Sequence, residues 1–373
     1  MPLGVEVTTR TAPAARGEST QTDTLFLAGE WTAGSTTPVL CKSIADVEAS
    51  FTTRSANADL WDYLDVYFRE GGRRAYVVKY TAGDLENALG LFEQGFGPGQ
   101  VVAPSTCASP DPSFGLLLDH AAEFNRFALL DGEIGDDAAA LADKADLIPA
   151  ENTEYGALFG PSVIVPAPAG VVGGSERTVH ASAVIAGLIA RADALGNPNR
   201  AAAGRDFPLQ YGIGFDPPIS DNDRSDLLDV GVNTFATKYG VLMNYGFQTK
   251  VAQDDSTPFW QANAVRARMA LVAAAREAGE AYMFKNIDGK GRLARALQSD
   301  LDAVCLNLYN ADGLFGETPA DAFSTEVGAS VNTVDNVAQG VLSAVVEARF
   351  SLHAKRVLIE LVSVPVTGVV TSA

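Results

Sequence analysis

FREGGRRAYVVKY, residues 68–80, joins two patterns that decide the fold. Ahead of its glycines, residues 58–70 carry apolar side chains at helical spacing, as on one face of an amphipathic helix. Gly71 and Gly72 follow the last helical turn, which is where left-handed cap residues occur. The apolar run AYVVKY that comes next is typical of a strand. The stretch therefore predicts a corner at which a helix ends and a strand begins.

A phosphate-binding loop has the opposite order, in which a strand is followed by glycines and by a helix whose positive N-terminus holds the anion. The helix end before Gly71 carries negative partial charge, which suits Arg73 and Arg74 but not a phosphate. GFGPGQ (95–100) also follows a helix, and GVVGGSERT (170–178) lacks the lysine of a P-loop. We therefore expect no nucleotide site, and a nucleotide-binding α/β enzyme is kept only as the alternative from another functional class.

Strand-like and helix-like segments alternate outward from this corner. Within residues 21–150 the alternation favours an α/β domain with a largely parallel sheet covered by helices. Residues 151–350 form a second expected domain with further strands and two long helices, the first of them expected to be capped by Ser256 or Thr257. Its stretch VLSAVVEARFSL is a predicted strand that turns one set of side chains to one face, Leu342, Ala344, Val346, Ala348 and Phe350, and another set to the opposite face, Ser343, Glu347 and Arg349. The predicted fold class is therefore α/β (α+β mixed), with several domains and mixed sheets covered by helices.

Both ends of the chain have the pattern of strands without a partner. Residues 1–20 form an expected N-terminal arm, in which Val5 and Val7 alternate with Glu6. Residues 351–373 form an expected C-terminal arm, whose stretch RVLIELVSVPV is apolar nearly throughout, as in a strand buried on both faces. Exposed strands are templates for pairing with another chain, so arms at both ends suit a chain that polymerises.

The composition narrows the class of partner. The formal net charge is −19 and the pI about 4.5. A protein that binds nucleic acid normally has a basic surface, so no nucleic-acid partner is expected. No apolar run approaches the ~20 residues of a membrane-spanning helix, so no membrane partner is expected either.

The sequence offers no catalytic constellation. Cys107 and His120 could pair as nucleophile and base, but no local signature surrounds them and a packed thiol is the favoured interpretation. The acidic run DGEIGDD (131–137) could hold a magnesium ion, although such carboxylates more often cap the helix that follows. We therefore expect no enzyme, no catalytic residue, no metal and no cofactor.

Taken in order, these stretches resemble the contractile tail sheath proteins of myoviruses, R-type bacteriocins and related contractile injection systems. FREGGRRAYVVKY resembles the Gly-Gly-x-Arg-x-Tyr-Val-Val-like corner of that family. The other stretches that follow the order of the family, over most of the chain, are PLGVEV, TLFLAGEWTAGSTTPVLCKSIADVEASF, SVIVPAPAG, HASAVIAGLIARADALGNPNRAAAG, GVLMNYGFQTKVAQDDSTPFWQANAVRARMALVAAA and VLSAVVEARFSLHAKRVLIELVSV. The chain departs from the family at residues 211–216, where a more basic, glycine-rich segment is common. Its short length suggests a minimal form without outer decoration domains.

What the resemblance implies is mechanical. Sheath subunits form hexameric rings stacked as a helix around a tail tube, and contraction drives the tube through the host envelope. The implied partners are other copies of the chain, the tail tube protein, and baseplate and tail terminator proteins. The implied location is the virion tail, assembled in the bacterial host cytoplasm. The sheath of a bacteriocin or another contractile injection system is the alternative within this class.

The resemblance also implies roles for particular residues. The arms add strands to sheets of neighbouring subunits, which makes the candidate inter-subunit residues Val5, Glu6, Val7, Val357, Ile359, Leu361 and Val362. The C-terminal arm is expected to bend at the turn formed by residues 352–355. In this family a helix late in the chain contacts the tube, which points to residues 289–312 and to Lys290, Arg292 and Arg295 as tube-facing candidates.

Overall fold

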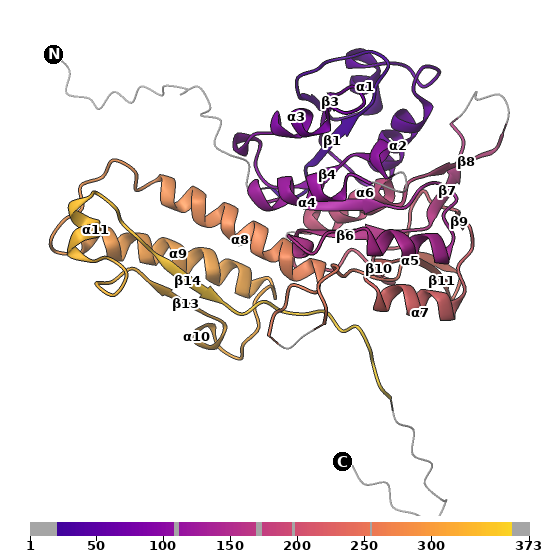
Figure 1. Cartoon of the computed structure of the whole chain (residues 1–373). Helices are drawn as coiled ribbons and strands as arrows, with labels where there is room; N and C mark the ends of the chain where they lie inside the picture. The colour runs from indigo at the N-terminus through magenta and orange to yellow at the C-terminus, as the bar shows by residue number, and fades with distance from the viewer. Residues whose placement is uncertain (1–20, 108–111, 169–173, 196–197, 254–255, 360–373) are drawn as a thin grey trace, which may run out of the picture.

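The computed structural model describes residues 21–107, 112–168, 174–195, 198–253 and 256–359 (Figure 1). Its largest sheet has seven strands in the order β10-β6-β5-β4-β1-β3-β2. These strands are β1 (Leu25–Gly29), β2 (Val39–Cys41), β3 (Ala75–Lys79), β4 (Gln100–Val102), β5 (Phe127–Asp131), β6 (Gly156–Phe159) and β10 (Val232–Asn233). All neighbours in it pair in parallel except β2, which runs antiparallel to β3 at one edge. The expected parallel sheet is therefore confirmed.

Helices cover both faces of this sheet. Along β1 the side chains of Leu25 and Leu27 enter one core, and those of Phe26 and Ala28 enter the other, as the two-residue period of a strand requires. The first core is closed by α1 (Ile44–Ser50), α2 (Ala58–Arg69) and α6 (Ala181–Ala194). The second is closed by α3 (Leu85–Gly90), α4 (Phe114–Glu123), α5 (Ala138–Asp146) and α7 (Asp221–Asp229). The apolar character of the strands thus reflects burial on both faces.

The glycines of the quoted stretch make the corner between α2 and β3. Gly71 has φ +119°, a value that favours glycine. A Cβ at Gly72 would lie 2.4 Å from the ring of Tyr67, whose hydroxyl donates to the carbonyl of Arg74 at 2.7 Å. Arg74 also pairs with Asp23 ahead of β1. The predicted helix–glycine–strand order is confirmed, and Arg74 binds a carboxylate of the protein itself.

Residue 150, where a domain boundary is expected, falls between β5 and β6, which are adjacent parallel strands of the one sheet. Two small sheets accompany the large one. One joins β7 (Ser162–Pro166) to β8 (Glu176–Val179) and β9 (Gly214–Asp216), and the other joins β11 (Phe235–Lys238) to β12 (Val241–Asn244). The expected division of the chain into an arm (1–20), two domains (21–150 and 151–350) and a second arm (351–373) stays a prediction.

The last third of the described chain projects away from the seven-stranded sheet (Figure 1), although Ala262, Val265 and Met269 at its start still pack into the first core. It contains α8 (Ala262–Glu280), α9 (Arg292–Asn310), α10 (Pro319–Ala322), β13 (Phe323–Glu326), α11 (Val334–Ala338) and β14 (Val345–Ala348). Two small apolar clusters lie between the long helices and the β13–β14 ribbon. No helix in the described ranges is long and apolar enough to cross a membrane.

The expected start of α8 is wrong. The helix begins at Ala262 with Gln261 as its N-cap, several residues after Ser256 and Thr257. The backbone N–H of Thr249 donates to the carbonyl of Trp260 at 3.0 Å, and Gln248 bridges Gln261. Because these backbone groups pair with residues 248 and 249, Gln261 adopts an extended backbone and the residues before it form a turn rather than a helix.

Candidate assembly surfaces

The ribbon of β13 and β14 is a two-stranded antiparallel sheet with an outer edge on β14. The registers pair Phe323 with Ala348 and Glu326 with Val345. The N–H of Arg349 donates to the carbonyl of Ala322 at 2.9 Å, so odd-numbered residues of β14 bond toward β13. Antiparallel pairing alternates, and therefore the backbone groups of Val346 and Ala348 point to the outer edge. Among the described residues, no hydrogen bond of these outer-edge groups is found.

The two faces of the ribbon differ in polarity. Val346, Ala348 and Phe350 pack toward α8 and α9, as the alternation of the sequence predicts. Glu347 and Arg349 are exposed on the opposite face, where Ser324 donates to Glu347 at 3.2 Å. An isolated two-stranded ribbon is marginally stable, so this one depends on its helices and offers an edge to a further strand.

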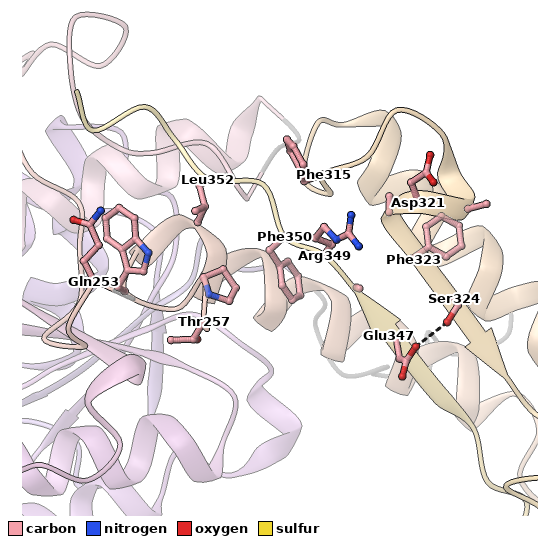
Figure 2. A pocket seen from close by; sticks show the side chains of 15 residues that line it. Gln253, Thr257, Phe315, Asp321, Phe323, Ser324, Glu347, Arg349, Phe350 and Leu352 are labelled. Atoms are coloured by element: carbon pink, nitrogen blue, oxygen red, sulfur yellow. Dashed lines mark hydrogen bonds between the residues drawn. The ribbon is translucent and has the colours of Figure 1, made fainter. Parts of the chain in front are cut away.

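An open groove of about 800 Å³ lies beside the ribbon (Figure 2). Glu347 of β14, Ser324 of β13 and Phe350 just after β14 line it on one side. Gln253 and Thr257, ahead of α8, line it on the other. The groove is bordered by apolar rings, a guanidinium and a carboxylate. Such a groove next to a strand edge can take both the backbone and the alternate side chains of an extended segment.

The C-terminal segment leaves this region with its apolar side chains in solvent. Val357, Leu358 and Ile359 are 73%, 78% and 85% exposed. They form no strand within the chain. Three consecutive exposed apolar residues are unusual at the surface of a globular protein. The remaining arm candidates, Val5, Glu6, Val7, Leu361 and Val362, lie outside the described residues, so their role stays a prediction.

Two side-chain amides fix the start of this C-terminal segment; we call Gln261 and Asn263 the amide clamp. Gln261 Nε2 donates to the carbonyl of His353 at 2.9 Å, and the N–H of His353 donates back to Gln261 Oε1 at 2.8 Å. Asn263 Nδ2 donates to the carbonyl of Ser351 at 3.3 Å, and its Oδ1 lies 2.8 Å from His353 Nδ1. His353, within the expected bend at 352–355, is thus held to the body.

Burial and the charge of Lys355 lower the pKa of His353 to about 4. The ring is therefore neutral at pH 7. Asn263 Nδ2 also donates to Asn199 Oδ1 at 3.1 Å, which leaves Asn263 Oδ1 as the acceptor facing the ring. The ring must then carry its proton on Nδ1.

The tube-facing candidates lie where the α8–α9 connection enters α9. Lys290, Arg292 and Arg295 are all exposed. Asp288 Oδ1 accepts from the N–H of Lys290 at 2.9 Å and of Arg292 at 3.1 Å, and Oδ2 accepts from Leu293 at 2.9 Å. These backbone donors, that of Leu293 first, hold the pKa of Asp288 below its usual range. The carboxylate thus caps the helix, and the three cations face solvent together.

The acidic run 131–137, considered as a magnesium site, makes contacts within the protein. Asp137 Oδ1 accepts from the N–H of Ala140 at 3.0 Å and so caps α5, while buried Lys144 binds Glu133 at 2.9 Å and Asp136 at 3.5 Å. The run 131–137 therefore serves caps and ion pairs, and across the described ranges no group of three metal-ligating side chains is found.

Cys107 and His120 do not form a nucleophile–base pair. Burial raises the pKa of Cys107 to about 12, and its Sγ donates to the carbonyl of Pro104 at 3.3 Å. Burial lowers the pKa of His120 to about 3, and its Nε2 lies 2.6 Å from buried Arg126. A thiol this hard to ionise is no nucleophile, so the expectation of a packed thiol agrees with the structure.

No protein-family model matches the sequence, and no curated protein matches it either. Solved structures do match. A chain of the anti-feeding prophage (AFP) baseplate has 17% identity and a TM-score of 0.73, covering 96% of this chain and 98% of that one. The PVC sheath complex of an extracellular contractile injection system, in its contracted state, gives 16% and 0.71, with 97% and 98% covered. A sheath tail protein from Desulfitobacterium hafniense gives 9% and 0.57, with 87% and 93% covered.

The chain therefore has the fold of contractile sheath proteins, and the resemblance predicted from sequence is confirmed at the level of fold. The groove, the amide clamp and the partner strand β13 were not predicted. Their residues lie far apart in sequence and carry no local motif, so only the exposed-strand pattern of β14 gave a signal.

Proposed function

We propose that this chain is the structural subunit of a contractile sheath, not an enzyme. The observation that carries the proposal is the outer edge of β14, which lies beside an open groove on the same molecule that exposes Val357, Leu358 and Ile359. An edge that accepts a strand and a chain end that can supply one are complementary between copies. A heterologous contact of this kind generates a ring where its rotation closes and an open helical filament where it does not, so it can build stacked rings.

In this proposal the two arms connect each subunit to its neighbours. Val357, Ile359, Leu361 and Val362 of one copy, or Val5, Glu6 and Val7 of another, add strands to the ribbon of a neighbour. Each main-chain hydrogen bond of an added strand contributes about 0.5–1.5 kcal/mol net, and contacts with several neighbours add to one another. Subunits form stacked hexameric rings and contract as rigid bodies joined by bendable arms, with the energy stored at assembly.

The further parts of the proposal concern partners and setting. Lys290, Arg292 and Arg295 face an inner tube, and the sheath ends on baseplate and terminator proteins. We expected a phage tail, located in the virion and assembled in the bacterial host cytoplasm. The PVC match is with an extracellular contractile injection system, which favours such a system as the setting. The genes beside the one for this chain distinguish the two.

Negative-stain electron microscopy of the purified chain at rising concentration tests the proposal. Striated hollow tubes or stacked rings are expected for the wild type and not for a chain lacking residues 357–373. Ala348→Pro is the sharper variant, because it removes an N–H on the outer edge of β14 and leaves the pairing with β13 intact. Its control is Glu347→Pro, which removes an N–H that bonds β13 and so destabilises the monomer.

Normal tubes from both the deletion and Ala348→Pro would refute strand addition at this edge. Nucleotide-dependent thermal stabilisation of the wild type, with no assembly at any concentration, would favour the enzyme alternative instead.

A further inference from the structure

The start of α8 contacts the segment at which the expected C-terminal arm begins. We call residues 261–266 the α8 root. At the beginning of this root the amide clamp holds Ser351 and His353. At its end lies Arg266, which is fully buried. The polar side chains of the root therefore point to two different neighbours from six consecutive residues.

Arg266 connects the α8 root to the beginning of the described chain through one carboxylate. Its guanidinium pairs with Asp193 in the last turn of α6, and Asp193 Oδ2 accepts from the hydroxyl of Thr22 at 2.7 Å. Thr22 is buried, and its carbonyl accepts from Gln100 Nε2 at 2.5 Å. The expected N-terminal arm, residues 1–20, ends just before Thr22. The base of that arm is thus bonded to the body and, through Asp193, to the α8 root.

A short loop segment joins the two ends of the α8 root. The carbonyl of Pro198 accepts from Arg266 Nη1 at 3.3 Å, and Asn199 Oδ1 accepts from Asn263 Nδ2 at 3.1 Å. Because Pro198 and Asn199 are adjacent in the chain, a displacement of one moves the other. The contacts therefore run without a gap from the base of one arm to the base of the other. We call this set of bonded groups the root network.

Burial makes the members of the root network depend on one another. Arg266 and Asn263 have no exposed surface, and the side chain of Asp193 is 7% exposed. A buried guanidinium that loses its carboxylate is strongly unfavourable, because water does not replace the partner. Hydrogen bonds in a buried chain also strengthen one another. A change at Asp193 is therefore passed to Arg266 and to residues 198–199.

Attachment of α8 to the body does not require these polar groups. Ala262, Val265 and Met269 already pack into the first core from the same part of the helix. Buried polar groups contribute little net stability beyond such packing, but they fix particular partners in particular positions. The root network therefore determines how the two arm bases are placed relative to each other.

We propose that the root network couples the bases of the two arms, so that loosening one base loosens the other. The inference goes beyond the proposed function, because it concerns the single chain and applies whether or not copies assemble. Coupling between two sites is reciprocal. A partner that orders one arm base thereby reduces the entropy lost when the other is ordered.

Hydrogen exchange of the full, unassembled chain tests the coupling. Thr22→Val removes one hydroxyl, keeps the shape of the side chain and leaves the pair of Asp193 and Arg266 in place. Although Thr22 lies at the far end of the root network, peptides covering residues 350–355 should exchange about threefold faster or more. Thr106→Val is the matched control. Its hydroxyl donates to the carbonyl of Ala103 at 2.8 Å, beyond the opposite end of β4, and exchange at 350–355 should not change.

A double variant shows whether the effect passes through the network. Asn263→Ala removes the bonds that join residues 199 and 351, so adding Thr22→Val to it should accelerate exchange at 350–355 no further. An equal acceleration by Thr22→Val in both backgrounds would overturn the proposal, because Thr22 would then act by another route. Unchanged exchange in Thr22→Val alone would overturn it as well. So would an equal acceleration in peptides from β1, since the effect would then be global.

Asp193→Asn is the stronger perturbation, because it takes the charged partner from Arg266. If this variant folds, as urea unfolding would show, exchange at 350–355 should rise about tenfold or more. A folded Asp193→Asn with wild-type exchange there would refute the coupling. If it does not fold, Thr22→Val decides. None of these measurements depends on polymerisation, so a failure of the proposed function and a failure of this inference are seen separately.

Discussion

Replacing Asn263 by alanine should loosen the start of the C-terminal arm without unfolding the chain. Asn263 is fully buried in the first turn of α8. The change removes its bonds to Ser351, His353 and Asn199. Losing the partners of buried polar groups costs about 1–3 kcal/mol. If about 1.4 kcal/mol is lost from the free energy of locally opening residues 350–355, the open form of this segment becomes ten times more populated.

Hydrogen exchange followed by mass spectrometry is the assay. Because the lost bonds bind Ser351 and His353 to the body, peptides covering residues 350–355 should exchange about tenfold faster or more in Asn263→Ala. Peptides from β1 should exchange at the wild-type rate unless global stability falls by as much. Urea unfolding of the same samples measures that global loss. Asn87→Ala is the control, because Asn87 is exposed and its amide bonds the surface carboxylate of Asp84.

Unchanged exchange at residues 350–355, in a variant that remains folded, would refute the amide clamp. An equal acceleration everywhere would show that Asn263 stabilises the whole fold and does not specifically hold the arm. If the clamp holds, the arm bends after His353, in the second half of the turn at 352–355.

Three further outcomes are expected. Burial and Arg126 lower the pKa of His120 to about 3, against about 6.5 unfolded, so below pH 6.5 the unfolded state binds more protons. The free energy of unfolding should therefore fall on acidification by up to about 1.4 kcal/mol per pH unit from this residue, and urea midpoints at pH 7 and 5 should differ less in His120→Asn. Cys107, with its pKa raised to about 12, should resist iodoacetamide at pH 8 until urea unfolds the chain. Gly72→Ala should lower stability by about 2 kcal/mol or more in urea unfolding, because its Cβ would lie 2.4 Å from Tyr67.

The sequence predicted those parts of the fold in which local pattern and tertiary environment agree. The corner at Gly71 and Gly72 is one case, because helix periodicity, glycine geometry and strand composition all point the same way. The alternation of Val346 and Ala348 with Glu347 is another, because a ribbon packed on two helices has one apolar face. Both signals are local and need no knowledge of what the segment contacts.

Prediction failed where distant segments decide the local structure. The start of α8 is displaced because Thr249 and Trp260 pair their backbones, which helix-capping patterns near residue 256 cannot reveal. The amide clamp joins residues about 90 positions apart, and amides have no spacing signature. The inter-subunit and tube-facing assignments depend on other chains and stay predictions. Of these candidates, the structure describes Val357, Ile359, Lys290, Arg292 and Arg295 as exposed.

The apolar and polar faces of β14 would also distinguish a correctly added strand from one that is out of register. If the N-terminal arm joins this edge as proposed, a shift of one residue in register would turn Val5 and Val7 toward the polar face and Glu6 toward the long helices. Such a misplaced strand gains main-chain bonds but loses burial, and so dissociates faster than a correctly placed one. Because strands in the wrong register dissociate faster than strands in the correct one, the proposed assembly would correct its register by dissociation alone, without a chaperone.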